Sequence, residues 1–295
     1  GIISTDKGTI KLDGKQVKLH SLIDAQEHKL AIVPQELALV EYFTVAENMF
    51  LGREQTKGGF ISKQKMFADA ATELKKLKID LDPKMLVGDL SVSQQQMLVI
   101  AKVLSLDAET IILDEPTAGV DPVSREELWK ILKAAVAQKG MSVLVSTAYL
   151  DEAAMCHDVY IINKGVILAQ GTPEALTEPY KNRVYFARAD GRTPRQMLDL
   201  ASHSSMILDS TPSGDGVRLL LKKDADLTEA AKELDIPELS PQPPRLEDAF
   251  MSLLIAADKP QKDFGENAGI ENTKIDDGKP VILVENLVKK DDSGI

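Results

Sequence analysis

The sequence predicts an α/β fold built on a parallel sheet, followed by a smaller α+β unit. Between residues 30 and 145, short apolar segments with strand character alternate with segments of helical periodicity, which is the pattern of a parallel sheet with helical connections. From about residue 183 the order becomes strand, helix, strand, strand, helix, strand, which is the order of a ferredoxin-like unit. We therefore expect two regions of different architecture in one chain.

Composition restricts the class of function. The chain has 295 residues, 43% of them hydrophobic, which is enough for a substantial core. It carries 46 acidic and 35 basic residues, a formal charge of −11, so nucleic acid and anionic lipid are not expected partners. The single cysteine, Cys156, excludes an internal disulfide and indicates a reducing compartment. The longest apolar runs, such as Leu30 to Val33, are far shorter than the roughly 20 residues of a membrane-spanning helix.

Turn residues define the first elements. Residues 8–19 alternate apolar and polar side chains around Asp13 and Gly14, and an Asp-Gly pair between two such runs predicts an antiparallel hairpin. Residues 30–33 form a short apolar segment that Pro34 ends, which predicts a strand.

Two capping boxes predict helix starts. Thr44 with Glu47, and Ser91 with Gln94, have the spacing at which each side chain caps a backbone amide of the other residue. The remaining segments of the first region are a helix over 67–77, a strand over 110–113, a helix from Pro122 to Gly140, a strand over 142–145, and a hairpin of 158–163 with 166–170.

The second region begins near Arg183. Its expected segments are strands over 184–188, 206–208, 217–221 and 236–239, helices over 194–201 and 228–234, and a closing helix over 245–255. Residues 257–280 are rich in Lys, Asp, Gly and Asn, which predicts a flexible linker. Residues 281–288 then begin a new strand for which we expect no remaining partner.

Two carboxylates follow a buried strand in the string IILDEP, residues 111–116. The carboxyl ends of parallel strands line the crevice where α/β proteins bind ligands, so Asp114 and Glu115 are placed to hold a metal ion and to orient a water. The alternative is a strand that merely ends in acidic residues at a loop.

Four more strings resemble motifs of ATP-binding cassette (ABC) ATPases, in the order that this family uses. They are IVPQ at 32–35, which resembles the Q-loop, LSVSQ at 90–94, which resembles the LSGGQ signature, the D-loop-like segment 118–121, and the switch segment 146–148. The resemblance covers residues 1 to about 180. It implies a P-loop NTPase-type ABC core with a helical subdomain, ATP and Mg²⁺ as cofactors, and action in a head-to-tail dimer.

The resemblance also assigns roles to residues. Glu115 corresponds to the catalytic glutamate, Asp114 and Gln35 to metal-binding residues, and the expected nucleotide-contacting residues are Gln35, Ser91, Ser93, Gln94 and Asp121. A serine and backbone amides at a helix N-terminus suit a phosphate of the opposite cassette.

Three departures from the family pattern bear on activity. No G-x-x-x-x-G-K-[ST] string occurs, so the P-loop and the N-terminal segment of the core are expected to be missing and the chain alone to be inactive. Val92 and Ser93 replace the two signature glycines. Ala148 occupies the position of the switch histidine, and His157 lies too far along the chain to substitute.

The predicted domains combine pattern and resemblance. They are a partial ABC ATPase domain over 1–180 with its helical subdomain at about 36–106, a ferredoxin-like appendage over 181–256, a linker over 257–280, and the first strand of a second cassette over 281–295. Residues 30–104 look like sugar-importer cassettes, whereas residues 114–255 look like exporter cassettes of tandem chains.

The leading hypothesis is the ATP-binding and ATP-hydrolysing subunit of an ABC transporter, N-terminal in a tandem protein and peripheral to the cytoplasmic face of the cell membrane. Its expected partners are transmembrane permease subunits and a second cassette, with no nucleic acid. One alternative is a non-catalytic docking or regulatory cassette, which Ala148 and Ser93 favour. Another is a ribosome-associated ABC ATPase, which the acidic charge disfavours. These sequence patterns do not indicate which substrate is transported or whether it is imported or exported.

Overall fold

The computed structural model describes residues 7–12, 14–54, 56–57, 60–188, 191–236, 238–257 and 282–288. The chain divides into two compact units, one of residues 1–148 with 270–295 and one of residues 149–269. We call the first the cassette unit and the second the appendage unit. The division assigns the hairpin near residue 165 to the appendage unit, whereas the sequence patterns grouped it with the cassette.

The cassette unit is built on a parallel sheet, which confirms the predicted fold class. Its strands are β3 (Leu30–Val33), β6 (Thr110–Asp114) and β7 (Ser142–Ser146), in the order β3-β6-β7. Ile32 pairs in register with Ile112, which pairs with Leu144. The carboxyl ends of the three strands therefore meet at one edge.

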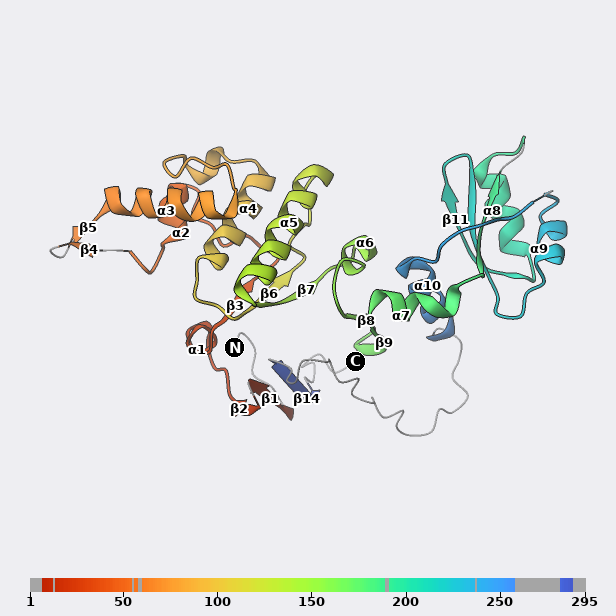
Figure 1. Ribbon diagram of the computed structural model, residues 1–295, viewed down its shortest axis with the longest axis horizontal. Helices are drawn as coiled ribbons and strands as arrows, with labels where there is room; N and C mark the ends of the chain where they lie inside the picture. The colour runs from red at the N-terminus through yellow and green to blue at the C-terminus, as the bar shows by residue number, and fades with distance from the viewer. Residues whose placement is uncertain are drawn as a thin grey trace, which may run out of the picture. The chain divides into compact units, whose positions relative to one another are not determined.

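Four helices form the core with one face of this sheet. They are α2 (Val45–Met49), α3 (Lys63–Leu77), α4 (Val92–Leu104) and α5 (Pro122–Lys139). Figure 1 shows α4 and α5 beside the strands, and α4 contacts β3 while α5 contacts β7. Leu98, Ile111, Leu113 and Leu128 are among the fully buried side chains of this core. Burying such side chains stabilises a fold by about 1.5–3 kcal/mol each.

The helix ends follow the capping residues. Both predicted capping boxes are present, at Thr44 for α2 and at Ser91 for α4. Asp121 caps α5, and Gly140 ends it with φ 63°, a left-handed conformation that glycine adopts at low cost. Substituting a good N-cap by alanine typically costs about 1 kcal/mol, so these residues define where the helices begin.

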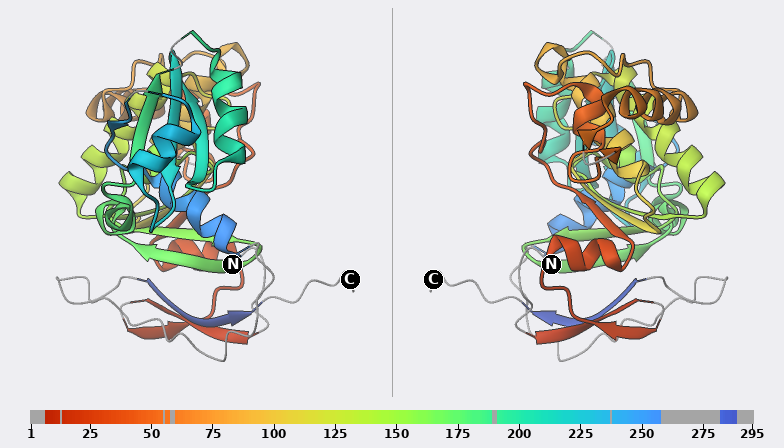
Figure 2. Two further views of the ribbon diagram at one scale, coloured as in Figure 1. Left: turned by 90° about the vertical axis from the view of Figure 1, so that its right-hand side faces the viewer. Right: turned by 90° about the vertical axis from the view of Figure 1, so that its left-hand side faces the viewer.

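The cassette unit also contains a small antiparallel sheet in the order β14-β1-β2. Figure 2 shows its strands side by side. The sheet contains β1 (Lys7–Leu12), β2 (Lys15–Val17) and β14 (Ile282–Val288), and β1 and β2 form the predicted hairpin. The expectation that residues 281–288 have no partner is wrong, because β1 has a second edge and β14 pairs with it. The predicted linker lies almost entirely outside the described residues. The unit also contains α1 (Leu22–Glu27), β4 (Thr56–Lys57), β5 (Phe60–Ile61) and a 3₁₀ turn, Val87–Asp89.

The appendage unit contains a four-stranded antiparallel sheet in the order β11-β12-β10-β13, the strand order of a ferredoxin-like fold. In chain order its elements are β10 (Val184–Arg188), α8 (Pro194–His203), β11 (Ile207–Ser213), β12 (Gly216–Leu221), α9 (Leu227–Glu233) and β13 (Ser240–Pro241). The unit also contains α6 (Leu150–Ala153), the hairpin of β8 (Val159–Asn163) and β9 (Val166–Gly171), α7 (Pro173–Thr177), a 3₁₀ turn (Glu178–Tyr180) and α10 (Leu246–Ala257).

The strand expected over 236–239 is wrong, since β13 is Ser240–Pro241. Ile236 donates its amide to the Ala231 carbonyl and so completes the end of α9. Ile236 and Leu239 are buried in the core of the appendage unit as side chains without pairing as a strand. The apolar character of Ile236 and Leu239 indicated that they are buried, but strand pairing begins only at Ser240.

The central strand of this sheet is buried on both faces. Val217, Leu219 and Leu221 of β12 belong to the core formed with α8 and α9. On the other face, Arg218 donates to both carboxylate oxygens of Asp248 in α10, at 3.3 Å from Nε and 2.7 Å from Nη2. Both side chains are more than nine-tenths buried, so this ion pair fastens α10 to the sheet.

Candidate functional site

Three of the predicted site residues lie at the carboxyl edge of the parallel sheet, and the other four lie at the starts of α4 and α5. Asp114 is the last residue of β6, Glu115 follows it, and Gln35 lies two residues beyond the end of β3. Gln35 Nε2 donates to Glu115 Oε2 at 3.1 Å. Neighbouring parallel strands therefore bring together two residues that are 80 positions apart in the sequence.

The backbone of Glu115 is unusual. Its φ is 43°, in the left-handed region that a non-glycine residue rarely adopts. Its amide donates to the carbonyl of Ser146 at the end of β7, at 2.9 Å, and its own carbonyl accepts from the Ala118 amide at 3.1 Å. Such conformations cost about 1–3 kcal/mol and cluster at functional sites. No sequence pattern predicts the hydrogen bond to Ser146, which fixes the turn after β6.

Asp121 lies between the N-termini of two helices. Its Oδ1 accepts from the amides of Val123 and Ser124, at 3.1 and 3.0 Å, and its Oδ2 accepts from Ser93 Oγ at 2.9 Å. Hydrogen bonds from Ser124 and then from Ser93 hold the pKa of the Asp121 carboxyl well below its usual range. Asp121 is therefore an anion that both helices stabilise.

The signature-like segment forms the start of α4. The Ser91 hydroxyl accepts from the Gln94 amide at 3.3 Å, and the Ser91 amide donates to Gln94 Oε1 at 3.0 Å. Val92 beside them is 54% exposed, so this helix start faces solvent. Sequence reasoning missed the contact between Ser93 and Asp121, which depends on the packing of α4 against α5.

The switch position is occupied by Ala148, two residues beyond the end of β7. Its methyl side chain offers no hydrogen-bond donor to a phosphate. A hydrogen bond or positive charge that stabilises a phosphate at this position must therefore come from another residue.

The residues at the sheet edge fit a magnesium ion only in part. Asp114, Glu115 and the Gln35 amide supply oxygen atoms, which Mg²⁺ prefers, and the hydrogen bond to Glu115 uses the Gln35 nitrogen and leaves its oxygen for a metal. Among the described residues no group of three or more His, Cys, Asp or Glu side chains could hold a metal. Mg²⁺ at such a site depends on waters and substrate phosphates for its remaining ligands.

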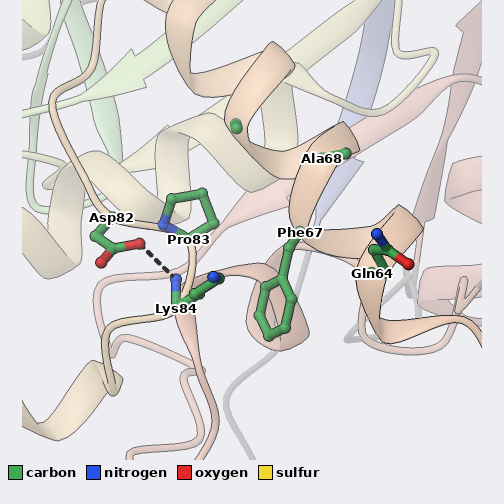
Figure 3. A pocket seen from close by; sticks show the side chains of 7 residues that line it. Gln64, Phe67, Ala68, Asp82, Pro83 and Lys84 are labelled. Atoms are coloured by element: carbon green, nitrogen blue, oxygen red, sulfur yellow. Dashed lines mark hydrogen bonds between the residues drawn. The ribbon is translucent and has the colours of Figure 1, made fainter.

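A shallow groove on the helical part of the cassette unit shares no residue with this edge. Figure 3 shows Phe67 of α3 beside the loop of Asp82, Pro83 and Lys84, whose amide donates to Asp82 Oδ1 at 2.9 Å. Lys84 Nζ lies 6.0 Å from the centroid of the Phe67 ring. The groove is lined mainly by apolar atoms and lacks the carboxylates of the sheet edge.

A parallel sheet with two carboxylates and a glutamine at its carboxyl edge, together with a capped helix at the signature-like segment, is the arrangement that the resemblance to ABC cassettes predicts. Residues 1–118 match the family model described as ABC transporter. The chain is 32% identical to the probable multidrug ABC transporter ATP-binding protein YbhF of Escherichia coli K12 over 293 residues. It is 37% identical to the galactose/methyl galactoside import ATP-binding protein MglA of Salmonella typhimurium over 177 residues.

The chain spans about half the length of the first of these curated relatives. The match covers 98% of the chain and 49% of YbhF, and 60% of the chain and 35% of MglA. The names of these relatives describe one as an import protein and the other as a probable multidrug protein.

Solved cassettes share the fold. CbiO1 from Clostridium perfringens, part of the ABC transporter complex cbiONQ, has a TM-score of 0.51 and 25% identity over 60% of this chain and 70% of its own. The ATP-binding cassette MJ0796, in a dimeric state bound to ADP and Pi, has a TM-score of 0.50 and 21% identity over 58% and 75%. Within the described part of the chain, no helix combines the length and hydrophobicity that crossing a membrane requires.

Proposed function

We propose that the chain is the ATP-binding part of an ABC transporter, in which ATP binding and hydrolysis between two cassettes drive separate membrane subunits. The observation that carries the proposal is the convergence of Gln35, Asp114 and Glu115 at the edge of the parallel sheet, with Gln35 hydrogen-bonded to Glu115. The cassette family and the names of the relatives support the same reading.

In this proposal each site residue has a chemical task. Asp114 and the Gln35 oxygen would hold Mg²⁺, which would supply positive charge to neutralise the phosphates of bound ATP. Glu115 orients the attacking water and accepts its proton. Ser91, Ser93, Gln94 and Asp121 lie on the surface that faces the nucleotide of the opposite cassette.

The proposed partners are transmembrane permease subunits and a second cassette, in the same polypeptide or in a dimer partner. The proposed location is the cytoplasmic face of the cell membrane, because an ATP-binding subunit acts where ATP is available and its permease is embedded. The relatives include one import protein and one probable multidrug protein, so the proposal names no substrate.

The first test is nucleotide binding by the 295-residue chain. The sequence contains no P-loop string, so the β- and γ-phosphates lack their usual cradle of amides and lysine, and we expect affinity for Mg-ATP weaker than micromolar. Titration with a fluorescent ATP analogue measures it, and a micromolar dissociation constant would contradict the expectation. We define the joined chain as this chain with the P-loop segment of YbhF added upstream. The joined chain should bind Mg-ATP far more tightly than the Ala148→His variant does.

Hydrolysis is tested in that joined chain. Glu115→Gln should lower the ATPase rate at least about 10²- to 10³-fold while ATP affinity remains, because an electrostatic contact to the reacting water is lost. Glu109→Gln is the matched control, since Glu109 precedes β6 at the opposite edge and pairs with exposed Lys29. Equal rates for the Glu115→Gln variant and the control would refute the catalytic role.

A second candidate function is a non-catalytic cassette that docks or regulates its partners. Two observations favour it: Ala148 lacks an imidazole, and the Ser93 hydroxyl donates to Asp121. The joined chain discriminates between the two functions. Tight ATP binding without hydrolysis, in the presence of the intact Glu115, would support the docking function.

A further inference from the structure

The side chain that replaces the second signature glycine has a defined partner. Ser93 is the second residue of α4, and its hydroxyl donates to Asp121 Oδ2 at 2.9 Å. The other oxygen of the same carboxylate accepts the amides of Val123 and Ser124 in the first turn of α5. The Asp121 carboxylate thereby accepts hydrogen bonds at the N-termini of both α4 and α5, which pack against each other.

The chemistry of the hydroxyl limits what else Ser93 can bind. Phosphate oxygens accept hydrogen bonds, and a serine hydroxyl has a single proton to donate. The Ser93 proton is used by Asp121, whose negative charge would also repel a phosphate placed beside it. Ser91 differs, because its oxygen accepts the Gln94 amide while its proton has no acceptor among the described residues.

We propose that Ser93 is a positioning residue that holds Asp121, and with it the start of α5, against the start of α4. The signature-like and D-loop-like segments then move as one unit, with Ser91 and not Ser93 as the hydroxyl donor to phosphate. This inference rests on the proposed function for the meaning of the two segments. The link itself exists without nucleotide and can be measured without it.

Hydrogen–deuterium exchange of the 295-residue chain tests the link. In Ser93→Ala the Asp121 carboxylate loses one of its anchors, so the amides of Val123 and Ser124 should exchange about three- to tenfold faster. Ser93→Thr keeps a hydroxyl and should restore the slow exchange. Unchanged exchange in the alanine variant would overturn the proposal.

A second measurement separates positioning from a general loss of structure. Hydrogen bonds from Ser124 and Ser93 lower the pKa of the Asp121 carboxyl, so Ser93→Ala should raise this pKa toward its usual range in an NMR titration, and Ser93→Thr should not. A pKa that stays unmoved in Ser93→Ala would also overturn the proposal.

Ser91→Ala is the matched control. It removes the cap of α4 and should speed exchange of the Gln94 amide while leaving the Val123 and Ser124 amides protected. Loosening of α5 to the same degree as in Ser93→Ala would assign the effect to α4 fraying and refute the link. Because none of these readouts uses ATP, failed nucleotide binding in the joined chain would count against the proposed function alone.

Discussion

Every residue of β12 in the appendage unit is buried, whereas β6, the central strand of the cassette sheet, buries Ile111 and Leu113 on one face and leaves Ile112 half-buried on the other. Ile112 pairs with Ile32 of β3 on one side and with Leu144 of β7 on the other, and these three residues form one row across the sheet. The Leu144 side chain is 53% exposed. Parallel strands are normally covered on both faces. Among the described residues, β12 is therefore covered on both faces, whereas the row of Ile32, Ile112 and Leu144 in the cassette sheet is covered only in part.

The largest expected effect comes from the buried ion pair of the appendage unit. Asp248→Ala leaves the Arg218 guanidinium buried without its carboxylate, and we expect a loss of about 3–5 kcal/mol in the free energy of unfolding. Urea denaturation followed by far-UV circular dichroism measures it. Asp215→Ala is the control, because the Arg188–Asp215 pair is largely exposed and should contribute less than about 1 kcal/mol. Equal losses in the two variants would contradict the role of burial.

The two faces of the cassette sheet give the next effect. Leu113→Ala creates a cavity in the core and should cost about 2–5 kcal/mol, whereas Leu144→Ala on the exposed row should cost less than about 1 kcal/mol. Trp129 is the single tryptophan and is buried in α5, so its fluorescence reports the unfolding of the cassette unit. A similar cost for the two substitutions would show that the row of Leu144 is covered in solution.

A smaller effect depends on pH and concerns the cap of α2. The Thr44 amide and then Lys63 lower the pKa of the Glu47 carboxyl by hydrogen bonding. A lowered folded-state pKa gives stability that is present above the unfolded value, about 4.3, and is lost as pH falls through the lower folded value. Glu47→Gln should therefore flatten the acid side of the Trp129 unfolding profile by a few tenths of a kcal/mol. Glu36→Gln, on an exposed loop residue, should leave that profile unchanged.

Local structure could be predicted from the sequence where a backbone requirement, such as a helix cap, selects a particular type of side chain. Capping boxes at Thr44 and Ser91, the glycine at 140 and the apolar runs at 30–33 and 110–113 each mark an element boundary that the structure confirms. Helix α1 escaped prediction although Ser21 caps it through the Asp24 amide, because the segment buries no side chain and so lacks an apolar period.

The candidate site was predictable as a set of residues and not as a set of contacts. Carboxylates after a buried strand point to the sheet edge, but nothing in the sequence pairs Gln35 with Glu115 or Ser93 with Asp121. These contacts depend on which strands and helices are neighbours, which is a property of the folded core. The left-handed backbone of Glu115 likewise has no sequence signal, since glutamate does not favour it.

The pairing of β3 with β6 also has a consequence for how the molecule assembles. The chain between β3 and β6 contains α2, α3 and α4, so these two strands pair across a long helical segment. By contrast, a single helix, α5, connects β6 to β7. Local contacts form faster than distant ones, so we expect β6 and β7 to pair before β3 joins them. The entropy of closing a loop grows slowly, by about 0.6 kcal/mol for each doubling of its length. A longer or shorter helical segment would therefore change how fast the edge with Gln35 and Glu115 is completed while barely changing its final stability.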